Sequence, residues 1–463
     1  MLSTNKRKIH FEVSERKILL RIVDLLVVLT SLYWVGVIFD FSYFELDWTN
    51  FYWIGILFVY ISFFGTVFNM YHLPATTNRL QVIQGVFLTT SATVLLYLLT
   101  PIFTPSLPHN RTQILYFYLA IFMALLLWRI FYMVFLASHR FMKKSILICK
   151  ASQFEKLAES LEKSDPHYRV IGFVKTDASE EDIKSKEVQT LAIQEVEDFI
   201  YTRGIYEIIV APNVNAASVH SCLLQLMEQG ISVKDYLHAY EHLAYKIPVD
   251  LIEDDFYRYF PFNRSNNNKL YLFAVRLGEI LFSLVGLIFS TFLLLPIILI
   301  GNLIGNRGSL FYTQDRVGKH GKEFRIIKFR TMVKDAEKDG AVFAQKNDMR
   351  ITPFGKFLRK SRIDELPQLI NVLKGEMAVI GPRPERAYFV EKITQAMPFY
   401  PARHAIKPGL TGWAQINYRY GDSIDDSVEK LKFDLFYIKH RSILLDANIV
   451  VKTIGTVLFY KGQ

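Results

Sequence analysis

The chain has 463 residues, of which 51% are hydrophobic and 14% aromatic, and its formal net charge is +10 at pH 7. This length and apolar content exclude a soluble protein with one ordinary core and predict segments that enter a membrane. The charge favours contact with an anionic lipid bilayer and not with nucleic acid, because no nucleic-acid-binding motif accompanies it. The two cysteines, Cys149 and Cys222, are not spaced for a metal site or a disulfide framework.

Four apolar runs open the chain, and each is close to the roughly 20 residues that cross a bilayer as a helix. They cover about residues 18–39, 51–69, 82–100 and 114–136, so residues 1–140 are predicted to form a four-helix transmembrane region. Basic residues precede the first run and follow the fourth, whereas the first loop carries three acidic residues. By the positive-inside rule, we expect both ends of this region to be cytoplasmic. Arg21 and Asp24 lie within the first run and are spaced to pair with each other.

Residues 141–240 alternate short strands with helices and predict a doubly wound, Rossmann-like α/β domain. The strand candidates are residues 145–149, 170–174, 207–211 and 231–236. A dinucleotide site would need a glycine-rich turn after the first strand, because the backbone must approach the pyrophosphate closely. That turn reads Cys149-Lys150-Ala151-Ser152. We therefore expect the fold without the dinucleotide cofactor.

A polar linker, residues 241–268, leads to a last domain, residues 269–463. The apolar run over residues 280–300 is long enough to span a membrane, but it contains Pro296 and has basic residues on both flanks. These features predict a re-entrant helix over about residues 276–304 that bends at the proline and returns to the same face. Near the C-terminus, an apolar tail next to charged residues predicts short interfacial helices.

Residues 361–385 hold the main catalytic candidates. Apolar residues spaced along one helix face predict a short helix ended by a glycine, and they are Leu366, Leu369, Ile370 and Leu373. Asp364 and Glu365 would then lie at its N-terminal end, where the helix dipole favours ionised carboxylates. Prolines on both sides of Arg383 hold it stiffly, which suits phosphate binding. Ser361 and Asp364 also match a capping box, so spacing alone leaves a purely structural role open.

Three segments of the last domain together resemble the monotopic phosphoglycosyl transferases, bacterial enzymes that start glycan assembly on polyprenyl phosphate. They are Lys328-Phe329-Arg330-Thr331-Met332, the run from Asp364 to Glu385, and Pro408-Gly409-Leu410-Thr411-Gly412-Trp413-Ala414-Gln415. The upstream layout resembles the long-form members. The resemblance implies an inner-membrane enzyme with a cytoplasmic catalytic domain. Such an enzyme transfers a sugar 1-phosphate from a UDP-sugar to undecaprenyl phosphate, releasing UMP, as the first membrane step of exopolysaccharide or capsule biosynthesis.

The resemblance also implies roles for individual residues. Asp364 would attack the sugar-linked phosphorus in a ping-pong mechanism through a covalent phosphosugar-aspartate, and Asp364 and Glu365 would bind Mg²⁺. Arg383 would contact the nucleotide phosphates. Further substrate-binding candidates are Pro382, Lys328, Arg330, Arg359 and Arg362, although a solvated or lipid-facing basic edge accounts for these cations equally well. For the α/β domain, the resemblance implies regulation or self-association.

Several alternatives stay open at this point. Glucose is the first expectation for the sugar, because the domain layout resembles glucose- or galactose-loading members, but no residue distinguishes it from galactose or an N-acetylated sugar. A membrane-tethered sugar-nucleotide dehydratase or epimerase would need the glycine fingerprint that is missing here. A non-catalytic scaffold for glycan assembly would not need the acid pair at residues 364–365.

Overall fold

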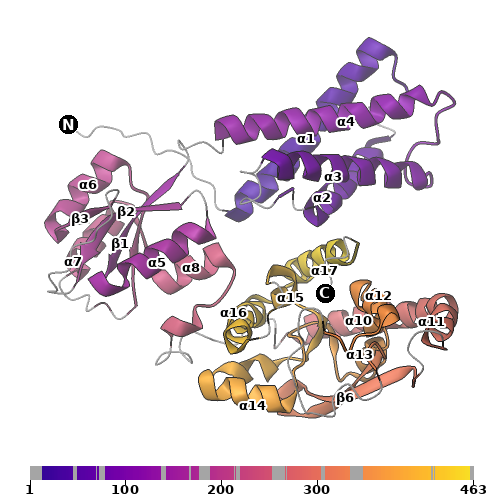
Figure 1. Cartoon of the computed structure of the whole chain (residues 1–463). Helices are drawn as coiled ribbons and strands as arrows, with labels where there is room; N and C mark the ends of the chain where they lie inside the picture. Colours follow the sequence, from indigo (N-terminus) through magenta and orange to yellow (C-terminus); the bar gives the residue numbers. More distant parts are fainter. Residues whose placement is uncertain are drawn as a thin grey trace. The chain divides into compact units, whose positions relative to one another are not determined.

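The computed structural model describes residues 13–44, 50–68, 70–71, 79–136, 142–165, 168–176, 188–212, 214, 219–252, 266, 268–303, 308–333, 348–418, 421 and 423–458. They belong to two compact units, Met1–Ala244 and Tyr245–Gln463. The first unit contains a helical bundle and a parallel sheet (Figure 1). The second unit contains the long apolar helix and the acid pair, Asp364 and Glu365.

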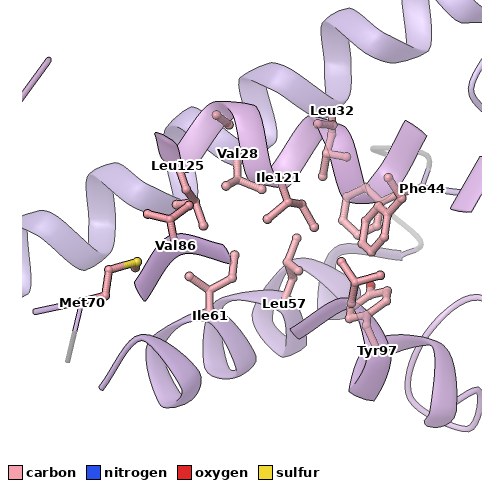
Figure 2. Close-up of a cluster of buried hydrophobic side chains, with 14 of the residues drawn as sticks. Val28, Leu32, Phe44, Leu57, Ile61, Met70, Val86, Tyr97, Ile121 and Leu125 are labelled. Carbon is pink, nitrogen blue, oxygen red and sulfur yellow. The ribbon is translucent and has the colours of Figure 1, made fainter. Parts of the chain in front are cut away.

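The first unit begins with four apolar helices: α1 (Val13–Phe39), α2 (Phe51–Val67), α3 (Arg79–Leu99) and α4 (Thr112–Phe131), which continues as a π-helical segment, Tyr132–Leu136. Side chains from all four helices meet in a buried apolar core, shown in Figure 2 by Val28, Leu57, Val86 and Ile121. Stretches of α1, α3 and α4 are long and apolar enough to cross a membrane, whereas α2 has 17 residues. The four predicted apolar helices are therefore present.

A buried ion pair crosses this bundle. Asp24 in α1 lies 2.6 Å from Arg129 in α4, and both side chains are almost fully buried. Arg21 instead donates to Thr66 Oγ1 in α2, and both guanidinium groups lie over the ring of Tyr71. The predicted Arg21–Asp24 pair is therefore wrong, because the carboxylate faces the neighbouring helix and not the preceding turn of its own.

The α/β domain has a five-stranded parallel sheet in the order β3-β2-β1-β4-β5. Its strands are β1 (Lys143–Cys149), β2 (Tyr168–Lys175), β3 (Gln189–Leu191), β4 (Glu207–Val210) and β5 (Ser232–Asp235). Its helices are α5 (Ala151–Ser164), the 3₁₀ turn Ile193–Glu195, α6 (Val196–Arg203), α7 (His220–Glu228) and α8 (Tyr236–Ala244). All four predicted strands form, and the short edge strand β3 is an addition.

The first long helical segment of the second unit comprises α10 (Lys269–Phe289), a π-helical segment (Ser290–Leu294) and α11 (Leu295–Gly301). An antiparallel hairpin follows, β6 (Phe311–Val317) and β7 (Glu323–Phe329), joined by the 3₁₀ turn Lys319–Gly321. Then come α12 (Pro353–Lys360), the 3₁₀ turn Ile363–Glu365, α13 (Gln368–Lys374) and β8 (Ala378–Ile380). The chain continues through α14 (Ala387–Ala396), the 3₁₀ segment Tyr400–Ala405, β9 (Gly409–Thr411), α15 (Trp413–Asn417), α16 (Ile424–His440) and α17 (Ile443–Leu458).

The helical stretch Lys269–Gly301 has 33 residues and is the fourth segment that could cross a membrane by length and composition. The π-helical segment immediately precedes α11, in which Pro296 is the second residue. Proline has no N–H and clashes with the carbonyl of the preceding turn, so the wider π-helical turn accommodates it. The return of this stretch to the face from which it enters stays a prediction.

Residues of the predicted linker are packed at its start. A 3₁₀ turn, Val249–Leu251, lies against α16, where the Ile247 N–H donates to Lys432 O at 2.9 Å and Lys432 pairs with Asp250 at 2.5 Å. Residues 253–265 and 267 of that linker lie outside the described residues. At its end, Asn268 caps α10 by accepting from the Leu270 and Tyr271 N–H groups.

Candidate active site

The acid pair lies in the 3₁₀ turn Ile363–Glu365 between α12 and α13. Arg362 enters this turn with a φ of 59°, a left-handed conformation that non-glycine residues adopt rarely. The Ser361 hydroxyl donates to Phe357 O and Leu358 O, so it closes the end of α12. The capping-box alternative is therefore wrong for this residue. The predicted glycine stop is confirmed, since Gly375 ends α13 with a φ of 82°.

Apolar neighbours anchor the acid pair to the long apolar helix. Ile363 and Leu366, on either side of the pair, pack against a buried cluster of Ile298, Phe329 and Leu358. Ile298 belongs to α11, in which Ile297, Leu299 and Ile300 are exposed. The turn that carries the carboxylates is thus held next to the segment that would enter lipid.

One face of α10 clamps α13. Arg276 donates to Val372 O at 2.7 Å and Leu373 O at 2.8 Å, so its guanidinium group satisfies carbonyls at the C-terminal end of α13. Glu279, three residues on, accepts from the Val379 N–H at 3.2 Å. Gly286 continues this face, and an added Cβ there would lie 2.7 Å from Leu369 Cδ1. Arg276, Glu279 and Gly286 of α10 therefore face α13 and β8, the elements that follow the acid pair.

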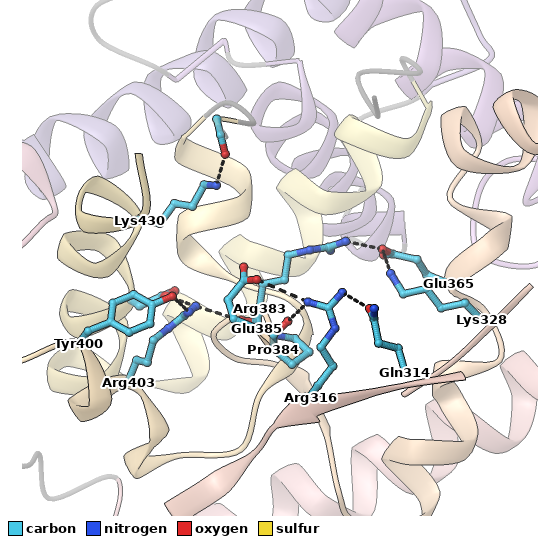
Figure 3. A network of polar contacts seen from close by, with 12 residues as sticks. Gln314, Arg316, Lys328, Glu365, Arg383, Pro384, Glu385, Tyr400, Arg403 and Lys430 are labelled. Carbon is cyan, nitrogen blue, oxygen red and sulfur yellow. Dashed lines mark hydrogen bonds and ion pairs between the residues drawn. The ribbon is translucent and has the colours of Figure 1, made fainter. Parts of the chain in front are cut away.

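Glu365 is held by three cations, all at Oε1. Arg383 Nη2 lies at 2.7 Å, Lys328 Nζ at 3.2 Å and Arg362 Nη1 at 3.8 Å (Figure 3 shows the first two). Burial alone would raise the pKa of Glu365, but Arg383, Lys328 and Arg362 hold it well below its usual range. Burial lowers the pKa of Lys328, against the opposing effect of Glu365. Glu365 is thus a fixed anion that gathers positive charge.

Asp364 is in a different state. It is 7% exposed, and its Oδ1 is buried without a hydrogen-bond partner in the part of the chain that the structure describes. Burial raises the pKa of Asp364 to about 6, and the adjacent Glu365 adds to the shift. Desolvation and the neighbouring anion thus act on the pKa of Asp364 against the helix dipole, which alone would favour the ionised form. A carboxylate with this pKa is mainly ionised at pH 7 and is more basic than an ordinary aspartate.

Two further arginines donate hydrogen bonds to the backbone of the segment that carries Arg383 (Figure 3). Arg403 donates to Arg383 O at 3.0 Å and pairs with Asp434 at 2.7 Å, and both members of this pair are at most 4% exposed. Arg316 donates to Pro384 O at 3.3 Å. On the other side, the Gly409 N–H donates to Pro382 O at 2.8 Å. The Gly-Pro-Arg-Pro segment is thus held by its backbone, while the guanidinium group of Arg383 contacts Glu365 of the acid pair.

The other predicted substrate-binding cations fall into two groups, those near Glu365 and those with other partners. Lys328 and Arg362 belong to the cluster around Glu365, whereas Arg330 donates to Ser309 O at 2.9 Å and Arg359 to Thr331 Oγ1 at 2.9 Å. Arg359 is still close enough to lower the pKa of Asp364, against the larger effect of burial. None of these contacts assigns a substrate role, so the predicted roles stay predictions.

The donor set tests whether magnesium fits here. Within the ranges given above, the structure has no group of three or more His, Cys, Asp or Glu side chains that could hold a metal ion. Magnesium in phosphoryl-transfer sites needs only one or two carboxylates besides substrate oxygens. Asp364 fits that requirement through Oδ1, which has no described partner, whereas Glu365 Oε1 already accepts from Arg383 and Lys328 and lies 3.8 Å from Arg362 Nη1. The residues present therefore fit a magnesium ion held by Asp364 and substrate, with Glu365 as the less suited ligand.

A small pocket that opens to solvent lies beside Lys328 and Arg383, the two closest partners of Glu365. Its lining residues are Arg316, Ile326, Lys328, Gln368, Arg383, Pro384 and Gly409. Sequence reasoning missed Arg316, Arg403 and Asp434, since each comes from a distant segment without a recognisable local pattern. Gln368 lay within the resembling run but was not singled out. Three cationic side chains in one pocket can bind a diphosphate.

Comparison with protein families gives two matches. Residues 270–460 match the bacterial sugar transferase family, and residues 66–234 match a family described as a CoA-binding domain. The first match contains every predicted site residue, from Pro296 to Arg383.

Individual relatives match the same region. An N-acetylgalactosaminephosphotransferase of Aeromonas hydrophila, which acts on undecaprenyl phosphate by its name, is 46% identical over 192 residues, 41% of this chain and 45% of that one. A Bacillus subtilis protein provisionally named undecaprenyl-phosphate N-acetylgalactosaminyl 1-phosphate transferase is 48% identical over 145 residues, 31% of this chain and 79% of that one. A UDP-glucose:undecaprenyl-phosphate glucose-1-phosphate transferase of Xanthomonas campestris is 42% identical over 167 residues, 35% of this chain and 34% of that one. The match thus spans less than half of the Aeromonas and Xanthomonas proteins.

Proposed function

We propose that this chain, which belongs to the bacterial sugar transferase family, transfers a sugar 1-phosphate from a UDP-sugar to undecaprenyl phosphate and releases UMP. The observation that carries this proposal is the contrast within the acid pair. Asp364 has a basic carboxylate oxygen without a partner among the described residues, and Glu365 next to it gathers Lys328, Arg362 and Arg383. A nucleophile beside fixed positive charge is the arrangement that attack on an anionic diphosphate requires.

The reaction proceeds in two steps. An oxygen of Asp364 bonds to the phosphorus that carries the sugar, and the bond from that phosphorus to the bridging oxygen breaks, so UMP leaves with that oxygen. An oxygen of the lipid phosphate then bonds to the same phosphorus, and the Asp364 carboxylate is released. Arg383 and Lys328 neutralise the diphosphate in both steps. Magnesium, when bound at Asp364, would lower the negative charge that the attacking carboxylate meets.

The acceptor is reached at the membrane surface. The acid pair packs through Ile363 and Leu366 on the cluster that contains Ile298 of α11, so a lipid phosphate at the interface would lie near Asp364. This requires the helical stretch Lys269–Gly301 to enter the inner membrane from the cytoplasm and return to it. Single cysteines replacing Lys269 and Lys319, in a chain with Cys149→Ser and Cys222→Ser, test this topology. An impermeant maleimide added outside intact cells should label neither position, and labelling of position 319 alone would mean that the helix crosses.

An assay with several UDP-sugars would identify the sugar that is transferred. Glucose is the expectation from the domain layout, while the relatives carry names for both N-acetylgalactosamine and glucose transfer. The test is UMP release from UDP-glucose, UDP-galactose, UDP-N-acetylglucosamine and UDP-N-acetylgalactosamine by the purified, membrane-reconstituted chain with undecaprenyl phosphate and magnesium. Release with one sugar identifies the donor, and release with none contradicts the proposal and favours a scaffold.

A further inference from the structure

The pocket beside Lys328 and Arg383 is lined by one uncharged polar side chain, that of Gln368. Gln368 is the first residue of α13 and lies one helical turn after Asp364. It is 3% exposed, and its Nε2 has no hydrogen-bond partner among the residues that the structure describes. It shares the pocket with Lys328 and Arg383, the two closest partners of Glu365.

A buried amide donor without a partner is unfavourable for folding. An unpaired buried N–H group loses its hydration without a compensating hydrogen bond, so a methionine of similar volume would suit a purely structural position better. Asn371, three residues later, shows how this helix satisfies a structural amide, since its side chain bonds Arg325 O, the Ile327 N–H and Glu376. Gln368 has no comparable set of contacts at Nε2.

We propose that Gln368 donates a hydrogen bond from Nε2 to a diphosphate oxygen of the sugar nucleotide, between the cations Lys328 and Arg383. This inference rests on the proposed function and adds a neutral amide donor to the guanidinium and ammonium groups that would contact the diphosphate. The guanidinium and ammonium groups attract the diphosphate by charge, and the amide adds a directional donor near the phosphorus that Asp364 attacks. The residue thus favours transfer at the expense of stability.

Two methionine variants test this inference. Gln368→Met removes the donor and keeps the volume. Gln415→Met is the matched control, because Gln415 Nε2 is also buried without a described partner but lies outside the pocket lining. We expect Gln368→Met to lower kcat/KM for the UDP-sugar by about tenfold to a hundredfold, with an unfolding midpoint equal to or above that of the wild type. Gln415→Met should leave kcat/KM unchanged.

The readouts separate a ligand contact from a structural role. If kcat/KM of Gln368→Met stays within about twofold of the wild type, or if kcat/KM and the unfolding midpoint fall together, the inference is wrong. If Gln368→Met does not fold, the near-isosteric Gln368→Glu replaces it and should weaken UDP binding at least about tenfold, since a carboxylate repels the diphosphate. UDP binding by calorimetry also decides the case in which the wild type transfers none of the sugars tested. In that case, weaker UDP binding by the Gln368 variant than by the wild type supports the inference, although the proposed function fails. Equal UDP binding by the two proteins, or no UDP binding by either, overturns the inference.

Discussion

Arg383 Nη2 lies 2.7 Å from Glu365 Oε1, and this ion pair joins the Gly-Pro-Arg-Pro segment to the acid pair. The two carboxylates therefore have different surroundings, although they are adjacent in sequence. Glu365 is neutralised by cations, while Asp364 keeps an oxygen without a described partner. The proposed division of labour, with Glu365 organising the cations and Asp364 as nucleophile, follows from this relationship.

Arg383→Lys should lower kcat/KM at least about a hundredfold, because a lysine cannot make the forked contact to Glu365 and a phosphate together. The measurement is the initial rate of UMP release as a function of UDP-sugar concentration. Arg325→Lys is the control, since Arg325 pairs with Asp315 on the surface and both side chains are well exposed. Equal rates for Arg383→Lys and the control would contradict the role of Arg383.

Asp434→Asn should destabilise the second unit by about 3 kcal/mol, because it leaves the Arg403 guanidinium group buried without its counter-charge. Thermal unfolding in detergent measures this effect, and kcat/KM should fall as well, since Arg403 holds the backbone of Arg383. Asp315→Asn, which breaks an exposed ion pair, should change the unfolding free energy by less than about 0.5 kcal/mol. A similar small effect of Asp434→Asn would show that the buried pair does not support Arg383.

Gly286→Leu should disturb the contact between α10 and α13, because its Cβ would lie 2.7 Å from Leu369 Cδ1. We expect a lower unfolding midpoint and a loss of UMP release of about tenfold or more, since overpacking of this size costs about 1–3 kcal/mol. Gly278→Leu lies on the same helix and has no atom within 4 Å of an added Cβ, so it should behave as the wild type. If both variants are equally active and stable, α10 does not position the acid pair.

The rate should fall at acid pH with the protonation of Asp364. Because burial raises the pKa of Asp364 to about 6, kcat/KM should be constant above that pH and decrease about tenfold per pH unit below it. Between about pH 4 and 6, the Asp364 carboxyl is protonated in the folded chain but ionised in the unfolded chain. The contribution of this group to the free energy of unfolding therefore decreases as pH rises through that window. Asp364→Asn should remove that part of the dependence. Parallel unfolding midpoints of the two proteins from pH 4.5 to 7 would contradict the raised pKa.

Local patterns predicted most of the secondary structure of the first unit, but in the second unit β6, α12 and α14 were not predicted. The four apolar helices of the first unit, the strands of the parallel sheet and the glycine stop after α13 depend on periodicity and composition, which a sequence displays directly. The strand β3 was missed, since its three residues carry no periodic signal. The partner of Asp24 was also missed, because it lies 105 residues away in α4.

The electrostatics of the site could not be predicted in the same way. The helix dipole argument for Asp364 considered one short helix, whereas its pKa depends on burial created by packing of Ile363 and Leu366 on distant segments. The contacts of Arg403 and Arg316 with the Gly-Pro-Arg-Pro backbone span 20 and 68 residues. Contacts between segments that are remote in sequence therefore decide the chemistry, while the motif only marks its place.

The most direct test of Asp364 as nucleophile is isotope exchange between labelled UMP and the UDP-sugar in the absence of undecaprenyl phosphate. A covalent phosphosugar intermediate on Asp364 makes the first step reversible without the lipid, so the wild type should move label from UMP into the UDP-sugar and Asp364→Asn should move none. Exchange that requires the lipid, or that Asp364→Asn catalyses as well as the wild type, would contradict the covalent relay through this residue.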